Sequence, residues 1–326
     1  MNNLLEIKDL HVEFRTMEGT VYALKGVNLA VKKGEALGLV GETGAGKSTT
    51  AFSVMGLLPK NSARIPKGSI LWGDKDLLDE KNEKYIRKVR GDRIAMVFQN
   101  PLTSLNPVFT IGEQVAMVFR RHQGMDEKRA YEAAGKMLQM VGIMPERMSD
   151  YPHQFSGGMR QRVGIAAAIA CKPDLLIADE PTTALDVTIQ AQVLELMKEL
   201  QEQVETSLIM ITHNLGIVKE LCQNVAVMYA GVIIESGSVD EVFRNPSHPY
   251  TLGLMGSLPD IKKKTDRLTP ISGFMPNPMI KPKGCAFAPR CPKCMEICTQ
   301  KEPGDMELNR EHIVACFLAR EGKSNE

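Results

Sequence analysis

The sequence shows no membrane-spanning segment and no excess of charge of either sign. No stretch of the chain approaches the roughly 18 consecutive apolar residues that a membrane helix requires, and Met1 to Glu6 lack the charged-then-apolar pattern of a signal peptide. The 40 Lys and Arg residues balance 39 Asp and Glu residues, which leaves a formal net charge of +1. A near-zero charge gives no global electrostatic reason to expect a nucleic-acid partner. We therefore expect a soluble, cytoplasmic chain.

Cysteine is rare in most of the chain and concentrated near its end. Cys171 and Cys222 stand alone, and we expect them to be small core residues within helices. The other five cysteines are Cys285, Cys291, Cys294, Cys298 and Cys316. In a reducing compartment such a cluster suggests metal binding rather than disulfides, and the C-x-x-C pair at 291–294, taken alone, favours zinc. His312, close to Cys316, is expected at the surface.

The first part of the chain has the patterns of strands. Residues 4–10 and 21–31 alternate or are β-branched and are separated by turn residues, which predicts an antiparallel sheet. Residues 35–40 form a short apolar run typical of a buried strand. A Gly-rich turn follows, and a helix is predicted to begin at Lys47.

The second part alternates between helices and strands. Residues 101–150, including the helical segment 127–141, contain few β-branched residues and predict an inserted helical lobe. Strands at 175–178 and 207–211, separated by a helix at 189–204, are typical of a parallel sheet. After about Asp240, frequent prolines predict an extended tail that leads to the cysteine cluster.

A phosphate-binding loop lies between the predicted buried strand and the helix that follows it. Its residues match the pattern G-x-x-x-x-G-K-S without a mismatch. Glycines let backbone N–H groups converge on phosphate oxygens, Lys47 would neutralise the β and γ phosphates, and Ser48 would bind Mg²⁺. The residues predicted to bind ATP here are Gly41, Glu42, Thr43, Gly44, Ala45, Gly46, Lys47, Ser48 and Thr49.

Two carboxylates end the strand at 175–178. Burying charge at the end of an apolar strand is unusual unless a cation or a reactive group lies there. Asp179 would bind Mg²⁺ directly or through water, and Glu180 would polarise the attacking water. Without the phosphate loop, a strand that simply runs into an acidic loop would be the better interpretation.

A second helix start suited to an anion occurs at residues 151–162. Ser156 is a good N-cap, Gly157 and Gly158 permit a close approach to the backbone, and a helix is predicted from Gln161 to Ala170. An ordinary capped helix is the alternative. The stretch resembles the signature motif of ABC ATPases, with Phe155 where that family often has Leu.

Other motifs of the ABC family follow in the expected order. Gln99, after a predicted strand at 94–98, resembles the Q-loop, Ala184-Leu185-Asp186 resembles the D-loop, and His213 resembles the switch histidine. The resemblance implies that two cassettes enclose two ATP molecules, each between one subunit's phosphate loop and the other's signature helix. It also implies that His213 contacts the γ-phosphate, that Gln99 joins Mg²⁺ to the membrane subunits, and that Asp186 lies at the nucleotide.

One further expectation about the nucleotide site depends on the same resemblance. An aromatic residue near the start of the chain is expected to stack on adenine, with Phe14 as the first choice and Tyr22 as the second. Either residue could equally be a core aromatic.

The C-terminal part of the sequence resembles that of a particular group within the ABC family. Residues 245–251 and 284–292 are similar to the C-terminal extension of dipeptide and oligopeptide importer ATPases, D-type subunits above all, and in part to nickel importers. That family pattern matches Cys285, Cys291, Cys298 and Cys316 and implies a 4Fe-4S cluster, with Cys294 as an extra thiol. Four thiolates suit such a cluster. Zinc or no metal remain alternatives, because the number of thiolates does not by itself choose the metal.

The sequence therefore predicts an α/β fold, an ABC-type P-loop nucleotide-binding domain with a RecA-like core. It would carry an antiparallel β subdomain, an inserted helical subdomain at about 101–170 and a Cys-rich C-terminal extension. The domains would be 1–240 and 241–326.

The predicted activity is ATP hydrolysis that powers peptide import from the cytoplasmic face of the membrane. The expected partners are a homologous ATPase subunit, two permease subunits and an extracytoplasmic solute-binding protein, without nucleic acid. Alternatives are a nickel or other small-solute importer, a soluble ABC ATPase that acts on DNA or ribosomes, and a cassette that binds ATP without hydrolysing it.

Overall fold

The structure, a computed structural model, describes residues 3–100, 104–182, 185, 187–204, 206–257, 271–309 and 311–319. In this part of the chain, no helix combines the length and the apolar character needed to cross a membrane. The chain forms two compact units. The first comprises Val31–Ala36 and Leu77–Ile211 with the N-terminal residues, and the second comprises Leu5–Ala30, Leu37–Asp76 and the chain from Thr212 onward.

Parallel strands form the sheet of the first unit. They are β6 (Ile94–Val97), β7 (Leu175–Asp179) and β8 (Ser207–Thr212), in the order β8-β7-β6. Every residue of these strands is buried, as expected for apolar runs in a parallel sheet. Helix α7 (Val187–Val204) connects β7 to β8 and confirms the predicted βαβ unit. Strand β6 ends at Val97, one residue earlier than predicted.

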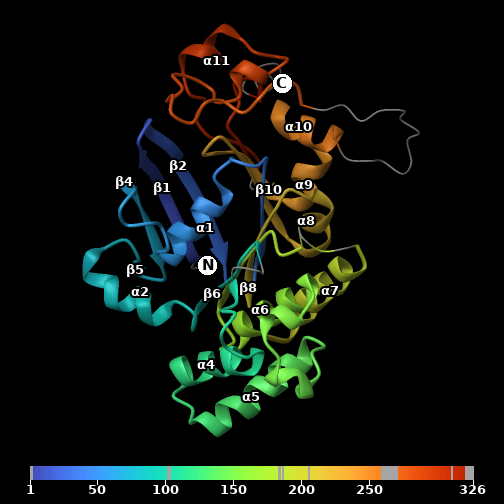
Figure 1. Cartoon of the computed structure of the whole chain (residues 1–326). Helices are drawn as coiled ribbons and strands as arrows, with labels where there is room; N and C mark the ends of the chain where they lie inside the picture. Colours follow the sequence, from blue (N-terminus) through green and yellow to red (C-terminus); the bar gives the residue numbers. More distant parts are fainter. Residues whose placement is uncertain are drawn as a thin grey trace. The chain divides into compact units, whose positions relative to one another are not determined.

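Helices with a shared apolar core make up the rest of the first unit. Helices α4 (Ile111–Gln123) and α5 (Glu127–Met140) lie side by side in Figure 1, and α6 (Gly157–Ile169) packs against both. Thr110 caps α4 in a capping box with Glu113, which fixes where the helix begins. The shorter elements of this unit are η1 (Glu80–Asn82), α2 (Glu83–Val89), η2 (Pro145–Ser149) and η3 (Pro152–Gln154).

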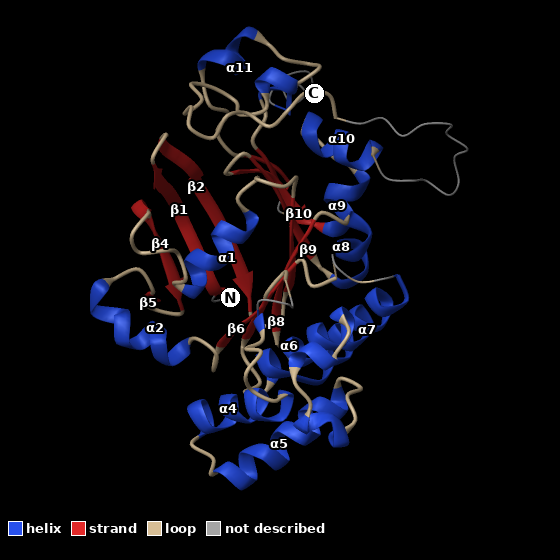
Figure 2. Cartoon of the chain, in the orientation of Figure 1, coloured by secondary structure: helices blue, strands red, loops and turns tan. Residues whose placement is uncertain are grey.

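The second unit contains the antiparallel sheet that the N-terminal pattern predicted. Its strands are β1 (Asn3–Thr16), β2 (Gly19–Lys32), β4 (Ala63–Trp72) and β5 (Lys75–Asp76), in the order β2-β1-β4-β5. Strands β1 and β4 are antiparallel, with Leu5 opposite Trp72, and Figure 2 shows β1, β2 and β4 side by side. The early strands are longer than predicted.

A second sheet of this unit carries the predicted buried strand, β3 (Ala36–Val40). Strand β3 pairs in parallel with β9 (Asn224–Tyr229), which pairs with β10 (Val232–Ser238). Helix α8 (Leu215–Leu221) covers β3 closely, because a Cβ on Gly38 would lie 2.5 Å from a methyl of Val218. The sheet continues with β12 (His312–Val314) and β11 (Met306–Asn309).

The predicted extended tail is wrong in its described parts. The chain after residue 238 forms α9 (Val239–Arg244), α10 (Pro249–Gly256), η4 (Ala288–Arg290) and α11 (Glu296–Gln300), and β12 pairs with β10. Pro249 is the first residue of α10, where a helix does not need the missing N–H and the fixed φ is favourable. A count of prolines could not distinguish this position from a helix interior.

Three further predictions about single residues need correction. His312 is buried, with 1% of its surface exposed, and its Nε2 lies 2.7 Å from Oε1 of the buried Glu235. Cys171 lies in a turn just after α6 and is half-buried, so it is not inside a helix. Cys222 is buried as predicted, but it follows the last residue of α8. Burial raises the pKa of the Cys171 thiol to about 11 and that of Cys222 to about 12, so both are protonated at neutral pH.

Candidate functional site

The phosphate loop joins β3 to α1 (Lys47–Met55) in the second unit, as predicted. Gly41 has φ 154°, and a Cβ there would lie 2.1 Å from the carbonyl oxygen of Met228. Gly46, the residue before α1, has φ 107°, and no side chain caps the helix. Side chains larger than hydrogen are therefore excluded at Gly41, and no side chain caps the first N–H groups of α1.

Lys47 lies over the carbonyl oxygens of its own loop. Its Nζ donates to the carbonyl oxygen of Gly41 at 2.6 Å and to that of Glu42 at 3.1 Å, and the residue is 6% exposed. Thr43 and Gly44 are exposed, whereas Ser48 and Thr49 are half-buried at the start of α1. These two contacts place a buried ammonium within the loop, where it can attract an anion.

Two predicted residues of the first unit lie in contact. Gln99, just after β6, donates from Nε2 to Oε2 of Glu180 at 2.9 Å. Glu180 has φ 44°, an uncommon value for a residue with a side chain, and its N–H donates to the carbonyl oxygen of Ile211 at 2.8 Å. Asp179, the last residue of β7, is 3% exposed. Backbone strain of this kind concentrates at functional sites, where the surrounding structure holds it.

The second predicted helix start also has the expected cap. The Ser156 hydroxyl accepts from the N–H of Met159 at 3.3 Å at the first turn of α6. A Cβ on Gly157 would meet open space, whereas one on Gly158 would lie 2.6 Å from a methyl of Ile189 in α7. Gly157 thus leaves the helix start accessible, and the lack of a side chain at Gly158 lets α6 pack closely on α7.

Phe155, the departure from the family pattern, has a clear structural role. Its ring is buried, and the guanidinium of Arg147 lies 4.1 Å from the ring centroid. Arg147 also pairs with Asp150 at 2.8 Å and donates to the carbonyl oxygen of Gln154 at 3.1 Å. The aromatic face provides a cation–π contact that a leucine would lack.

The remaining predicted nucleotide residues are placed, but their roles stay predictions. His213 is exposed and follows β8. Phe14 is half-buried on β1 opposite Ala63, and Tyr22 is half-buried on β2, where its N–H donates to the carbonyl oxygen of Pro278 at 2.9 Å. The predicted D-loop residues Ala184 and Asp186 lie outside the described residues.

Three of the four cysteines predicted as iron–sulfur ligands, Cys285, Cys291 and Cys316, have a raised pKa because they are buried and, to a smaller extent, because other thiols lie near them. Burial is the main cause that raises the pKa of Cys285 to about 11, and it also raises the pKa of Cys291 and Cys316. The N–H of Cys285 donates to the carbonyl oxygen of Cys298 at 2.8 Å. In the described part of the chain, however, no three His, Cys, Asp or Glu side chains are arranged to hold a metal ion. The structure therefore does not support the predicted cluster.

Two residues of this site were missed by sequence reasoning. Arg290 and Tyr250, from the C-terminal part of the second unit, contact Glu42 of the phosphate loop. Both residues lie in the tail segments, 245–251 and 284–292, that carry the family resemblance, so the sequence did indicate that these segments matter. It gave no sign of which side chains would meet the loop 208 to 248 residues away.

A Gly-rich loop between a buried parallel strand and a helix, with a lysine at the first helical residue, defines a P-loop nucleotide-binding protein. Comparison with known proteins supports the assignment of the chain as a P-loop nucleotide-binding protein. A family model described as "ABC transporter" matches residues 24–183, and one described as "Oligopeptide/dipeptide transporter, C-terminal region" matches residues 234–298.

Related sequences and solved structures assign the chain to a narrower group within the ABC transporters. It is 49% identical over 98% of its length to the dipeptide transport ATP-binding protein DppD of Bacillus subtilis, 95% of which is covered. It is also 49% identical, over 98% of its length, to the oligopeptide transport ATP-binding protein AppD of the same organism, 98% of which is covered. A dimeric bacterial ABC transporter cassette, MJ0796, matches with a TM-score of 0.65 and 27% identity over 72% of this chain and 98% of that one. The chain belongs to the ABC transporter family, among the ATP-binding proteins of dipeptide and oligopeptide transport.

Proposed function

We propose that this chain hydrolyses ATP to power the uptake of dipeptides or oligopeptides through an ABC importer. The observation that carries the proposal is the near-complete match, at 49% identity, to both dipeptide and oligopeptide transport ATP-binding proteins. The match of residues 234–298 to the C-terminal region of such transporters supports it independently of the cassette. Because peptides are bound by other subunits in an importer, the choice between short and long peptides lies outside this chain.

The proposed reaction converts ATP and water to ADP and phosphate. Lys47 and the loop N–H groups would bind the β and γ phosphates, and Ser48, Gln99 and Asp179 would hold Mg²⁺. Glu180 would polarise the attacking water. The contact between Gln99 and Glu180 supports a shared role at the reacting phosphate. The other residues proposed at the nucleotide are His213, Asp186, Thr49 and Phe14, with Tyr22 as the alternative to Phe14.

We propose that catalysis belongs to a pair of cassettes. In that pair Ser156, Gly157 and Gly158 of one subunit would face the nucleotide on the phosphate loop of the other. The open space at Gly157 and the dimeric form of the related cassette MJ0796 support this arrangement. The partner would be a homologous cassette, and the pair would lie at the cytoplasmic face of the membrane against two permease subunits that receive peptide from a solute-binding protein. Residues 1–240 would form the nucleotide-binding domain, with a helical subdomain at about 101–170, and residues 241–326 the extension.

Reconstitution of the whole importer tests this function. The chain, its partner cassette, the permeases and the solute-binding protein would be assembled in vesicles, and ATP hydrolysis measured with dipeptides, longer peptides and nickel. We expect peptides to stimulate hydrolysis several-fold. Stimulation by nickel and by no peptide would contradict peptide import and favour a metal importer of the same family.

We also propose, from the sequence alone, that Cys285, Cys291, Cys298 and Cys316 hold a 4Fe-4S cluster, with zinc as the alternative. The donor set supports the proposal, since four thiolates are the ligands of such clusters. Metal and sulfide analysis of the chain purified without air is the test. Iron and sulfide near four per chain are expected, whereas zinc alone or no metal would overturn the cluster.

A further inference from the structure

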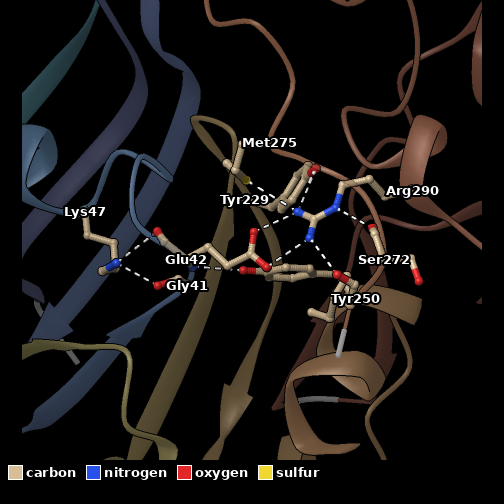
Figure 3. A network of polar contacts seen from close by, with 9 residues as sticks. Gly41, Glu42, Lys47, Tyr229, Tyr250, Ser272, Met275 and Arg290 are labelled. Atoms are coloured by element: carbon tan, nitrogen blue, oxygen red, sulfur yellow. Dashed lines mark hydrogen bonds and ion pairs between the residues drawn. The ribbon is translucent and has the colours of Figure 1, made fainter. Parts of the chain in front are cut away.

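Glu42, the second residue of the phosphate loop, is bound by two residues of the C-terminal part of the chain. Its carboxylate accepts from Nη1 and Nη2 of Arg290 at 2.7 and 3.1 Å. Its N–H donates to the hydroxyl of Tyr250 at 2.9 Å. Figure 3 shows the Glu42 side chain extending toward Arg290 and away from the ammonium of Lys47. One loop residue is therefore fixed through both its main chain and its side chain.

Arg290 is held in place by contacts that leave its position little freedom. Its Nε donates to the carbonyl oxygen of Ser272 at 2.9 Å, and Nη2 donates to that of Ile271 at 3.3 Å. The guanidinium lies 5.7 Å from the ring centroid of Tyr229, and its side chain is only 5% exposed. A buried, bidentate pair between a guanidinium and a carboxylate is among the stronger polar contacts in proteins. The Glu42 carboxylate beside it raises the pKa of Arg290, so the cation is permanent.

The aromatic residues around this pair connect the tail to the sheet. The rings of Tyr229 and Tyr250 have centroids 4.7 Å apart, and both pack on the buried Phe287, at 5.1 and 5.4 Å. Tyr229 is the last residue of β9, whereas Phe287 precedes η4, which ends with Arg290. Offset and edge-on aromatic contacts of this kind add to the burial of the rings. The position of Arg290 is thus set by the core of the second unit.

A carboxylate in a phosphate loop is unfavourable for an anionic ligand unless it is neutralised. The carbonyl oxygen of Glu42 is 3.1 Å from Nζ of Lys47, so an unrestrained Glu42 side chain could reach that ammonium and compete with phosphate for it. Arg290 prevents this in two ways, since it neutralises the carboxylate and holds it on the far side of the loop.

We propose that Arg290 and Tyr250 are positioning residues of the nucleotide site, through which the C-terminal part of the chain sets the affinity of the phosphate loop for ATP. The inference deepens the proposed ATPase function and rests on it only in taking ATP as the ligand. It gives a role to two tail segments, 245–251 and 284–292, that lie outside the motifs proposed to carry out hydrolysis.

The test is a double-mutant cycle on the full-length chain, read out as the dissociation constant for MgATP by calorimetry. Arg290→Gln should weaken binding about tenfold, a loss typical of a charged hydrogen-bonded pair. In the Glu42→Gln background the same Arg290→Gln change should weaken binding less than about threefold, because no carboxylate is left to neutralise. Tyr250→Phe should weaken binding about threefold. Arg244→Gln, which changes an exposed arginine of α9, is the matched control and should leave the dissociation constant unchanged.

Several results would overturn the inference. These are an unchanged dissociation constant in Arg290→Gln, an equal loss in both backgrounds, or a loss of the same size in Arg244→Gln. If Arg290→Gln does not fold, as judged by its thermal transition, Arg290→Lys takes its place with an expected loss of about threefold, since a lysine keeps the charge but not the two-pronged contact. The assay needs no transport, so a chain that passes it in an importer unresponsive to peptides would refute the proposed function and leave this inference intact.

The kinetics of ATP hydrolysis distinguish a positioning role of Arg290 from a general loss of activity. A positioning role predicts a KM for ATP that rises about tenfold in Arg290→Gln while kcat at saturating ATP stays within about twofold. A fall of kcat with KM unchanged would instead mean that Arg290 acts in the chemical step, and it would contradict the proposal.

Discussion

The two units place their acidic site residues in opposite ways. In the second unit, Glu42 is fixed by the buried Arg290 and by Tyr250, which themselves pack in an aromatic core. In the first unit, Glu180 is half-buried on a strained backbone, and its side chain accepts a hydrogen bond from the exposed Gln99. The comparison suggests that nucleotide binding depends on a rigid core, whereas turnover depends on less buried residues.

The N-terminal ends of helices α1 and α6 also differ between the two units. Helix α1 begins after Gly46 and has no side-chain cap on its first N–H groups. Helix α6 begins after Ser156, whose hydroxyl caps it. Substitutions in the second unit should therefore change affinity or stability, and substitutions of Glu180 and Ser156 in the first unit should change turnover.

The largest effect is expected at Glu180 in the first unit. Glu180→Gln should lower kcat of the assembled importer by about 10² to 10⁴, the range for loss of a general base, because the amide cannot accept the proton from water. ATP binding and the thermal transition should remain close to those of the wild type, and dimers trapped with ATP should accumulate on gel filtration. Glu195→Gln, on the exposed face of α7, is the control and should retain wild-type turnover. Unchanged turnover in Glu180→Gln would remove Glu180 from the mechanism.

Much of this contrast could be predicted from the sequence. The phosphate loop, the strand before Asp179 and the cap at Ser156 depend on local patterns, and each was found at its predicted place. The contact of Gln99 with Glu180 was not predicted, because a pair 81 residues apart leaves no local signal.

The C-terminal part was predicted least well, for a physical reason. Pro249 begins a helix, and His312 is buried against Glu235. The burial of His312 depends on the pairing of β12 with β10, a contact between distant segments. Composition can indicate turns and prolines, but it cannot show that a remote strand will cover a histidine or supply an arginine to a loop.

The second-largest effect is a loss of folding stability at acidic pH, which we expect from a buried histidine of the second unit. Burial lowers the pKa of His248 to about 4, from an ordinary value of 6.5, although the carboxylate of Glu235 acts in the opposite direction. The unfolded chain therefore binds more protons between pH 6.5 and about 4, so stability is complete above pH 6.5 and falls as the pH falls through this window. The loss by pH 4 should be about 3 kcal/mol. Urea unfolding between pH 4 and 7 measures it.

The structural cause is a polar cluster around the start of α10. Nδ1 of His248 accepts from the N–H of Tyr250, and a protonated ring could not do so. Glu235 accepts hydrogen bonds from the N–H groups of Ser247 and His248 and lies against His312. The titratable neighbours of His248 in this cluster are therefore Glu235 and His312. His248→Asn keeps an acceptor and should flatten the dependence, whereas His153→Asn, at an exposed site of the first unit, should not. An equally steep loss in His248→Asn would show that another group is responsible.

A smaller effect, on affinity, is expected at Gly41. In Gly41→Ala the new Cβ would lie 2.1 Å from the carbonyl oxygen of Met228, at φ 154°, so the loop must move. Strain of about 1–3 kcal/mol should weaken MgATP binding about tenfold to a hundredfold. Gly256→Ala, where a Cβ would meet nothing within 4 Å, should bind ATP like the wild type. Wild-type affinity in Gly41→Ala would mean that the loop tolerates movement, and the contrast between the units would be lost.

The smallest effect is expected at Ser156, where stability and turnover can be separated. Ser156→Ala removes the hydroxyl that caps α6 and should cost about 1 kcal/mol of unfolding free energy. Ser238→Ala is a matched control, because Ser238 caps α9 through the N–H of Glu241 at the same 3.3 Å distance. Both variants should lose similar stability in urea unfolding, since the two caps are alike. Turnover of the assembled pair should fall about fivefold in Ser156→Ala alone, if this hydroxyl meets the partner's nucleotide. Equal turnover in the two variants would reduce Ser156 to an ordinary helix cap, and the first unit would then contribute to catalysis through Glu180 and Gln99 without its second helix start.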